Sequence, residues 1–503
     1  MKNSQKIKYN LIVGFGSQLL TIILGIVIPR LTLVNYGSEV NGLINSITQI
    51  YSYIGLLEAG IGTAAVQALY RTVGSEDRNR TNAILAATNR YYNRTGVLYT
   101  IAIIAFSLIY PLLVSTEIPT VTVVLIILLN GAGSVIGFFV QRKYLLLLQA
   151  EGKNYIESTL TMILNVLRNV AKIVLMAMGM DVILVQAVAM LLGFIQMVYI
   201  TMYIKKHYAW IDLTVEPDYE SISQSKNVLV HQLSSLIFNN TDSIILTVFC
   251  GLKVVSVYSL YTMLFSMISN ALSVVINSVV FSLGQAYHTD RKRFDEMYDA
   301  YELFYMTLVF ALYSVAYYFI LPFVKRYTAG VTDINYLDPL LPTLMVSLYL
   351  LSCGRSAPSQ AINIAGHFKN TQYRSLAESV INITVSLLAV QRWGIYGVLI
   401  GTIAALLYRV NDMILYSCKH ILMRSPWITY RRWLINLAVF IGVHCLSRLI
   451  SMRLESYGLI VLFCIPYTIC TLAVFFGIAF VTNPSTAKPL LRLAMAAIRP
   501  RRR

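Results

Sequence analysis

A small set of charged side chains lies inside long apolar stretches of this 503-residue sequence. The cations are Arg30, Arg168, Lys172, Arg355, Arg409 and Arg448, and the acids are Glu58, Asp242, Glu378 and Asp412. A charge at the centre of a membrane helix costs about 2.5–3.5 kcal/mol on insertion scales, so such groups face protein, water or a ligand. Cations outnumber acids, which favours binding of an anion over binding of a cation.

The strongest anion-site candidates are Arg168 and Lys172, which are four residues apart and therefore share one helix face. Two like charges at low dielectric repel each other unless an anion or an acid lies between them. The alternative is that each pairs with an acid elsewhere. Arg355 lies between a glycine and a proline that can break its helix and free backbone groups to line a cavity. Arg409 and Asp412, three residues apart, are expected to neutralise each other.

Three further residues are candidates for a substrate chamber. Arg30 follows Pro29 and either faces a cavity or extends to the outer headgroups. Glu58 lies too deep in its span to reach a headgroup, so we expect it to pair with Arg30 or another cation, or to take part in transport. Asp242 follows the polar run 239–241 in an otherwise apolar helix, which favours a position facing a cavity.

The composition places these charges in a membrane protein. Hydrophobic residues make up 57% of the chain and charged residues only 13%, about half the share that soluble domains carry, and the mean hydropathy is +0.65. A soluble enzyme, a disordered chain and a fibrous protein are therefore excluded. The sequence has no phosphate-binding loop and no zinc, redox or hydrolase motif, so we expect no enzymatic activity and no cofactor.

About fourteen stretches are long enough to cross a bilayer as helices, and none alternates with a period of two as a barrel strand would. They cover approximately residues 10–34, 41–69, 95–114, 120–141, 156–178, 182–204, 227–250, 255–283, 302–324, 340–364, 375–392, 396–418, 433–452 and 457–481. Of the lysines and arginines between these stretches, 29 fall in one set of alternating loops and 5 in the other. This bias predicts an even number of spans with both termini in the cytoplasm.

The longest polar break after the sixth span divides the chain into two comparable blocks. We expect an N-lobe of six helices at 1–206, a cytoplasmic linker at 207–226 and a C-lobe of six helices at 227–421. Two extra helices at 422–483 and a basic cytoplasmic tail at 484–503 complete the chain. The tail is expected to contact anionic membrane lipid and not nucleic acid.

Short motifs occur in both halves of the chain. They are Pro29-Arg30, Tyr36-Gly37, Asn41-Gly42-Leu43 and Tyr53 to Gly62 in the first half, and Asn240 to Leu246 and Val257 to Tyr261 in the second. Together they resemble the motifs of bacterial polysaccharide flippases. These flippases share a superfamily with the multidrug and toxic compound exporters and with the lipid II flippase. The resemblance implies two six-helix lobes around a central cavity, lined chiefly by helices one, two, seven and eight. By position, Arg30, Glu58 and Asp242 fall on those helices, whereas Arg168, Lys172 and Arg355 do not.

The resemblance also implies a substrate and a membrane. We expect a flippase in the bacterial cytoplasmic membrane that moves a lipid-linked oligosaccharide, usually on undecaprenyl pyrophosphate, to the outer leaflet by alternating access. A monomer is expected, and Na⁺ or H⁺ is the counter-ion to be considered, with Glu58 and Asp242 as carriers. One alternative is a cation or drug exporter of the same architecture, which needs more acids than cations in its cavity. The other is a polysaccharide polymerase or ligase, which would carry a large external loop.

Overall fold

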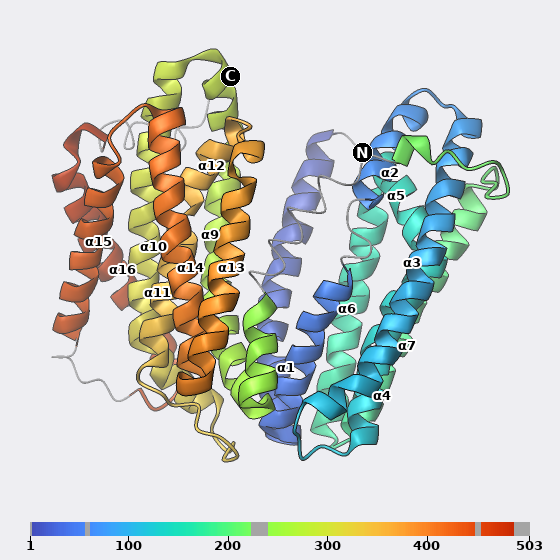
Figure 1. Cartoon of the computed structure of the whole chain (residues 1–503), viewed down its shortest axis with the longest axis horizontal. Helices are drawn as coiled ribbons and strands as arrows, with labels where there is room; N and C mark the ends of the chain where they lie inside the picture. The colour runs from blue at the N-terminus through green and yellow to red at the C-terminus, as the bar shows by residue number, and fades with distance from the viewer. Residues whose placement is uncertain (1–2, 56–60, 223–239, 448–453, 487–503) are drawn as a thin grey trace. The chain divides into compact units, whose positions relative to one another are not determined.

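The computed structural model describes residues 3–55, 61–222, 240–447 and 454–486. All regular elements in these residues are helices, which confirms the predicted all-α class (Figure 1). Helical residues occupy the described part of every predicted span. Eight of the described helices are long and apolar enough to cross a membrane by themselves. The chain is therefore a multi-pass membrane protein.

Contacts between residues divide the chain into two compact units, Met1–Ser256 and Val257–Arg503. The division falls inside helix α9 (Leu252–Thr289), whose first turn packs in unit 1. The helical segment 240–250 also belongs to unit 1. The lobe boundaries expected at 206 and 227 stay a prediction.

Unit 1 contains seven named α-helices in its described residues. They are α1 (Asn3–Ile54), α2 (Ile61–Gly74), α3 (Arg78–Leu113), α4 (Thr120–Val140), α5 (Arg142–Ala150), α6 (Asn154–Ala177) and α7 (Val182–His207). A short 3₁₀ helix, η2, covers Glu220–Ile222. Aspartates cap two of the longer helices, because their carboxylates accept backbone N–H groups that have no partner within the helix: Asp77 caps α3 and Asp181 caps α7.

Helix α1 contains the first predicted span and the first half of the second, joined by a kink. Gly37 has φ 82 and ψ 177 there, a conformation that glycine adopts without a steric penalty. Gly42, one turn further, permits a direct approach of α1 to the start of α9, because an added Cβ would lie 1.9 Å from the Leu252 carbonyl oxygen. Beside this contact the Asn41 amide donates to Ser256 Oγ at 2.7 Å. The kinked half of α1 is therefore fixed against α9 within unit 1.

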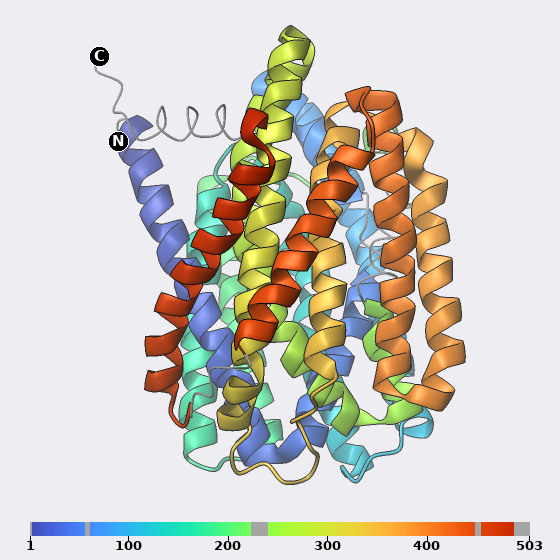
Figure 2. The same ribbon diagram turned by 90° about the vertical axis from the view of Figure 1, so that its left-hand side faces the viewer.

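Unit 2 contains most of α9 and seven further α-helices in its described residues. They are α10 (Arg291–Tyr327), α11 (Leu341–Gly354), α12 (Ser356–Ile364), α13 (Phe368–Trp393), α14 (Ile395–Ser417), α15 (Trp427–Ser447) and α16 (Tyr457–Thr482), with a π-helix, η3 (Cys418–Leu422), after α14. Helices α13 and α14 run side by side (Figure 2), because Gly397 and Gly401 let α14 approach the α13 backbone closely. The expected break at Arg355 is confirmed, since α11 ends at Gly354.

Four buried or partly buried charges join α10 to α15 and to the turn before α15. The Arg432 guanidinium contacts Glu302 at 2.6 Å and Asp299 at 2.8 Å, and Arg424 contacts the same two carboxylates at 2.6 and 2.7 Å. Thr429 donates to the second oxygen of Glu302 at 3.0 Å. Two cations face two acids, so the cluster is neutral and its hydrogen bonds offset much of the cost of burying it.

Candidate functional site

Helix α6 has two chemically opposite faces. Ile163, Leu167, Val170 and Val174 lie on one face and are each about half exposed, which suits contact with lipid. The opposite face carries polar side chains at helical spacing: Asn154, Glu157, Ser158, Thr161, Asn165, Arg168, Asn169 and Lys172. A spanning helix cannot present such a face to hydrocarbon without a large free-energy cost, so this face must meet protein, water or a polar ligand.

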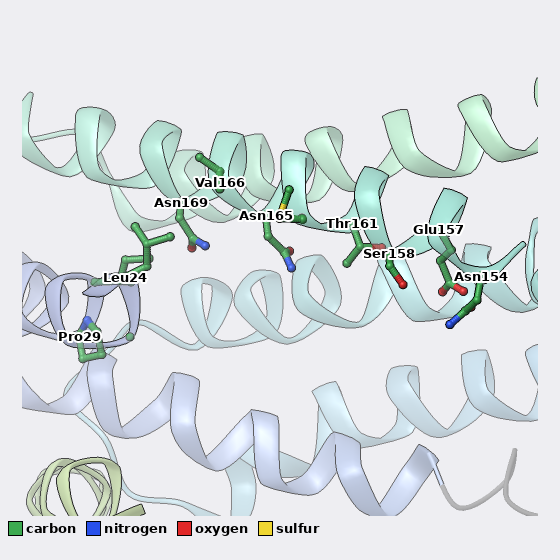
Figure 3. Close-up of a pocket in the computed structure, with 12 residues that line it drawn as sticks. Leu24, Pro29, Asn154, Glu157, Ser158, Thr161, Asn165, Val166 and Asn169 are labelled. Carbon is green, nitrogen blue, oxygen red and sulfur yellow. The ribbon is translucent and has the colours of Figure 1, made fainter. Parts of the chain in front are cut away.

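Part of the polar face lines a cleft of about 750 Å³ between α6 and α1. Figure 3 shows Asn154, Glu157, Thr161, Asn165 and Asn169 in a row along α6, with side chains directed away from its axis. The side chains of Asn154 and Asn165 are exposed, and those of Glu157, Thr161 and Asn169 are half-buried. The row offers amides, a hydroxyl and one carboxyl group over about four turns of helix.

Helix α1 supplies the other wall of the cleft. Pro29 and Gly25 both line it. A proline has no N–H, so Pro29 leaves the Gly25 carbonyl, four residues earlier, without its usual helical donor. Arg30 follows directly on α1 and is partly buried, but it is not among the residues that line the cleft. A polar ligand in the cleft would therefore meet hydrogen-bonding groups on α1 as well as on α6.

Arg168 and Lys172 lie at the margin of the polar face, toward α7. Arg168 Nη2 lies 3.5 Å from the position of a Cβ added at Gly193, and Lys172 Nζ donates to Gln186 Oε1 at 3.4 Å. Both side chains are half-buried. Within the described residues neither cation has a carboxylate within 4.0 Å. The two positive charges therefore have neutral neighbours, which is the arrangement that favours an anion.

The start of α6 is tied to the end of α7 outside the spanning segments. Lys153 Nζ contacts Glu151 Oε2 at 2.7 Å and Tyr208 Oη at 2.9 Å, and the Tyr208 hydroxyl donates to Glu151 at 2.5 Å. The hydrogen bond to Glu151 raises the pKa of Lys153, and burial with the Glu151 contact raises the pKa of Tyr208 to about 12. Further along, Gln196 of α7 donates to Thr161 at 2.9 Å. These contacts fix the rotation of α6 and so the direction of its polar face.

The remaining predicted residues of the first unit lie elsewhere. Glu58 falls outside the described residues. Asp242 is 4% exposed in segment 240–250, next to Thr241, whose hydroxyl lies 2.7 Å from that of Tyr53 on α1. Asp242 is thus buried among polar groups between α1 and its own segment, and its role in binding stays a prediction.

Arg355 belongs to unit 2 and is neutralised there. Its guanidinium contacts Glu378 at 2.5 Å, and Arg409 contacts the other oxygen of Glu378 at 3.4 Å. Arg409 also pairs with Asp412 at 2.9 Å, which confirms the pairing expected from their spacing, and Arg374 contacts the same carboxylate. Glu378 lies in the middle of α13, because that helix begins seven residues earlier than predicted. A substrate role for Arg355 stays a prediction.

Sequence reasoning missed most of the α6 face. It identified Arg168 and Lys172 but not the neutral residues Asn154, Thr161, Asn165 and Asn169, although their three- and four-residue spacing was visible. No group of three or more His, Cys, Asp or Glu residues in the described chain is placed to hold a metal ion. What α6 offers is hydrogen bonding to hydroxyls and amides, next to two cations that attract phosphate.

Comparison with known proteins gives one family and a set of similar folds. A family model described as polysaccharide biosynthesis protein matches residues 7–281. The structure of the lipid II flippase MurJ in an inward closed conformation is similar, with a TM-score of 0.69, 13% identity, and coverage of 94% of this chain and 99% of that one. An inward-facing multidrug resistance MATE family transporter of the MOP superfamily has a TM-score of 0.62, 17% identity, and coverage of 78% and 94%. No curated protein matches the sequence significantly.

Proposed function

We infer the function from the family to which this chain belongs, the polysaccharide biosynthesis protein family. We propose that it is a flippase that moves a lipid-linked oligosaccharide from the inner to the outer leaflet of the bacterial cytoplasmic membrane. The observation that carries the proposal is the polar face of α6, where amides and hydroxyls adjoin two cations without carboxylate partners in the described residues. Family membership and the fold shared with a lipid flippase support it.

Each part of the substrate has a matching set of side chains. The planar guanidinium of Arg168 can donate two parallel hydrogen bonds to a phosphate, and the Lys172 ammonium adds a second positive charge. Asn154, Thr161 and Asn165 can exchange hydrogen bonds with sugar hydroxyls and acetamido groups, since amides and hydroxyls both donate and accept. The lipid tail needs no polar site and stays in the bilayer.

Transport follows by alternating access. The two halves change their relative arrangement, so the polar face of α6 meets first one side of the membrane and then the other. A potential that is negative inside favours outward movement of an anion by about 2.3 kcal/mol per charge per 100 mV. A pyrophosphate with two charges would gain about twice that, so the membrane potential contributes to the driving force. No bond is made or broken, and counter-transport of Na⁺ or H⁺ is part of the same proposal.

The test is a flipping assay in liposomes containing the purified chain. A fluorescent lipid-linked oligosaccharide is placed in both leaflets, and a membrane-impermeant reagent quenches the outer one over time. We expect faster transfer than in empty liposomes, with no new glycosidic bond in the recovered lipid. Transfer of a cationic dye alone would identify a cation exporter, and elongated glycans would identify a polymerase or ligase, so either result would overturn the proposal.

Two variants separate the site from the scaffold. Replacing both Arg168 and Lys172 with alanine should reduce flipping at least tenfold, because each charged hydrogen bond contributes about 1.5–3 kcal/mol. The control replaces Lys205 and Lys206, exposed in the last turn of α7, and removes the same charge. Full flipping by a normally inserted Arg168→Ala/Lys172→Ala protein would exclude the site.

A further inference from the structure

A second cleft, of about 920 Å³, lies wholly in unit 2 between the end of α9 and α12. Polar side chains of α9, of α12 and of the first turn of α10 line one end of it: Gln285, His288, Thr289, Gln360, Asn363 and Arg293. The charges of the loops predict that this end faces the cytoplasm. The cleft contains none of the residues of the α6 site.

The polar end of the cleft has one cation with a fixed backbone. Asp290 caps α10, and its carboxylate accepts the Arg293 backbone N–H at 3.1 Å, which holds Arg293 in the first turn. The Arg293 side chain is exposed, and in the described residues it has no carboxylate within 4.0 Å. Its neighbour Arg291 is instead paired with Asp295 at 3.3 Å. Arg293 is thus the arginine of this turn that is placed to receive an anion in the cleft.

The other end of the cleft is apolar. Val280 and Phe281 line it about 12 Å along α9 from His288, at 1.5 Å per residue. Val274, Phe281 and His288 recur every seven residues and so share one face of α9. Phe281 is 72% exposed within the described structure, so the described residues leave most of its ring uncovered. This face forms an apolar strip that leads to the polar end.

We propose that this cleft binds the headgroup of a phosphate-bearing lipid. Arg293 donates to the phosphate, and Thr289, Gln285 and Asn363 complete the hydrogen bonds of the phosphate and of any attached sugar or glycerol. The first carbons of the lipid chain lie against Val280 and Phe281. A free phosphate would use only the polar end, and a carboxylate peptide would leave the apolar strip uncovered.

Binding is measured on the purified full chain in detergent with two fluorescent probes, a phosphatidylglycerol and a polyprenyl phosphate. Arg293→Gln should weaken binding of at least one probe on the order of tenfold, because it removes a charged donor. Lys292→Gln is the matched control, since it removes the same charge from the adjacent residue, which does not line the cleft. It should change the affinity less than twofold.

The two probes distinguish the source of the ligand. Loss of both affinities means that the cleft accepts membrane phospholipid and polyprenyl phosphate alike, and loss of one identifies the ligand. Equal losses in Arg293→Gln and Lys292→Gln, or no loss in either, would show a general surface effect and overturn the proposal. The α6 site is unchanged in these variants, so this result is independent of the flipping assay.

A third variant tests the apolar end. Phe281→Ser should weaken binding of each lipid whose binding Arg293→Gln weakens. It should leave the affinity for inorganic phosphate, measured by competition, unchanged. The lipid proposal is wrong if the wild-type protein binds inorganic phosphate as tightly as the lipid probes and Phe281→Ser does not change the affinity for either probe. The ligand is then a free anion. Thermal unfolding of each variant confirms that it is folded.

Discussion

Replacing Lys172 with methionine should stabilise the protein without substrate while weakening substrate binding. The backbones of Arg168 and Lys172 are four residues apart on α6, which is about 6 Å. The residues that their side chains approach on α7, Gln186 and Gly193, are seven residues apart, which is about 10 Å. The two charges are therefore about 6 to 10 Å apart. At an effective dielectric of about 20, two unit charges at these distances repel by about 2–3 kcal/mol. Both side chains are mostly buried but keep some contact with solvent within unit 1, so screening reduces the net repulsion to about 1–2 kcal/mol.

The variant removes this repulsion and one buried charge, at the cost of a weak 3.4 Å contact to Gln186. We therefore expect the free energy of unfolding to rise by about 1 kcal/mol. Substrate binding, by contrast, should weaken about tenfold because a charged donor is lost. A residue that serves only the scaffold would not show this opposition between stability and binding.

The assay is thermal unfolding in detergent with and without inorganic pyrophosphate. The unliganded variant should unfold at a higher temperature than the wild type, and pyrophosphate should stabilise it less, because ligand stabilisation scales with the logarithm of concentration over Kd. Lys206→Met, at an exposed lysine of α7, is the control and should change neither quantity appreciably. A destabilised Lys172→Met protein would refute the reasoning, since it would mean that an acid neutralises Lys172.

Three further predictions concern other parts of the fold. Gly42→Ala should destabilise by about 1–3 kcal/mol in thermal unfolding, because the added methyl group would overlap the Leu252 carbonyl; an unchanged melting temperature would contradict the close approach. Arg432→Met should cost about 3–5 kcal/mol, since it leaves Glu302 buried without one of its cations, and limited proteolysis should then release α15 first. Asp218 has a lowered pKa through hydrogen bonds from Ser221, so its contribution to stability is present above about pH 4 and is lost as pH falls through the lower folded-state pKa. The melting temperature of an Asp218→Asn variant should therefore differ from that of the wild type at pH 7 but approach it at pH 3.

The presence of the helices could be predicted from the sequence, because each spanning helix satisfies its own backbone hydrogen bonds. Whether a stretch forms such a helix therefore depends mainly on its own residues. The break before Ser356 was predicted for the same local reason, from a glycine and a proline. The partner of Arg355 was not predicted, because Glu378 lies 23 residues away on another helix and only packing brings the two side chains together. Arg432 lies just outside the span predicted from residue 433, and its burial at 2% exposed in the cluster with Glu302 depends on packing against α10.

The candidate site shows the same limit. The pairing of Arg409 with Asp412 and the shared face of Arg168 and Lys172 follow from spacing on one helix. The cleft between α6 and α1 cannot be predicted from spacing, because it depends on how two helices far apart in the sequence pack together. The polar face of α6 is nevertheless visible in the sequence, because its neutral polar residues have the same helical spacing as its cations.

The central claim is that the polar face of α6 meets water at membrane depth and the opposite face meets lipid. Cysteine accessibility in membranes tests it directly, with the six native cysteines replaced, by comparing Asn165→Cys with Leu167→Cys on the same helix. We expect a charged thiol reagent to modify Asn165→Cys rapidly, lipid-linked oligosaccharide to slow this reaction, and Leu167→Cys hardly to react. Equal rates at the two positions, or no protection by the lipid, would contradict it.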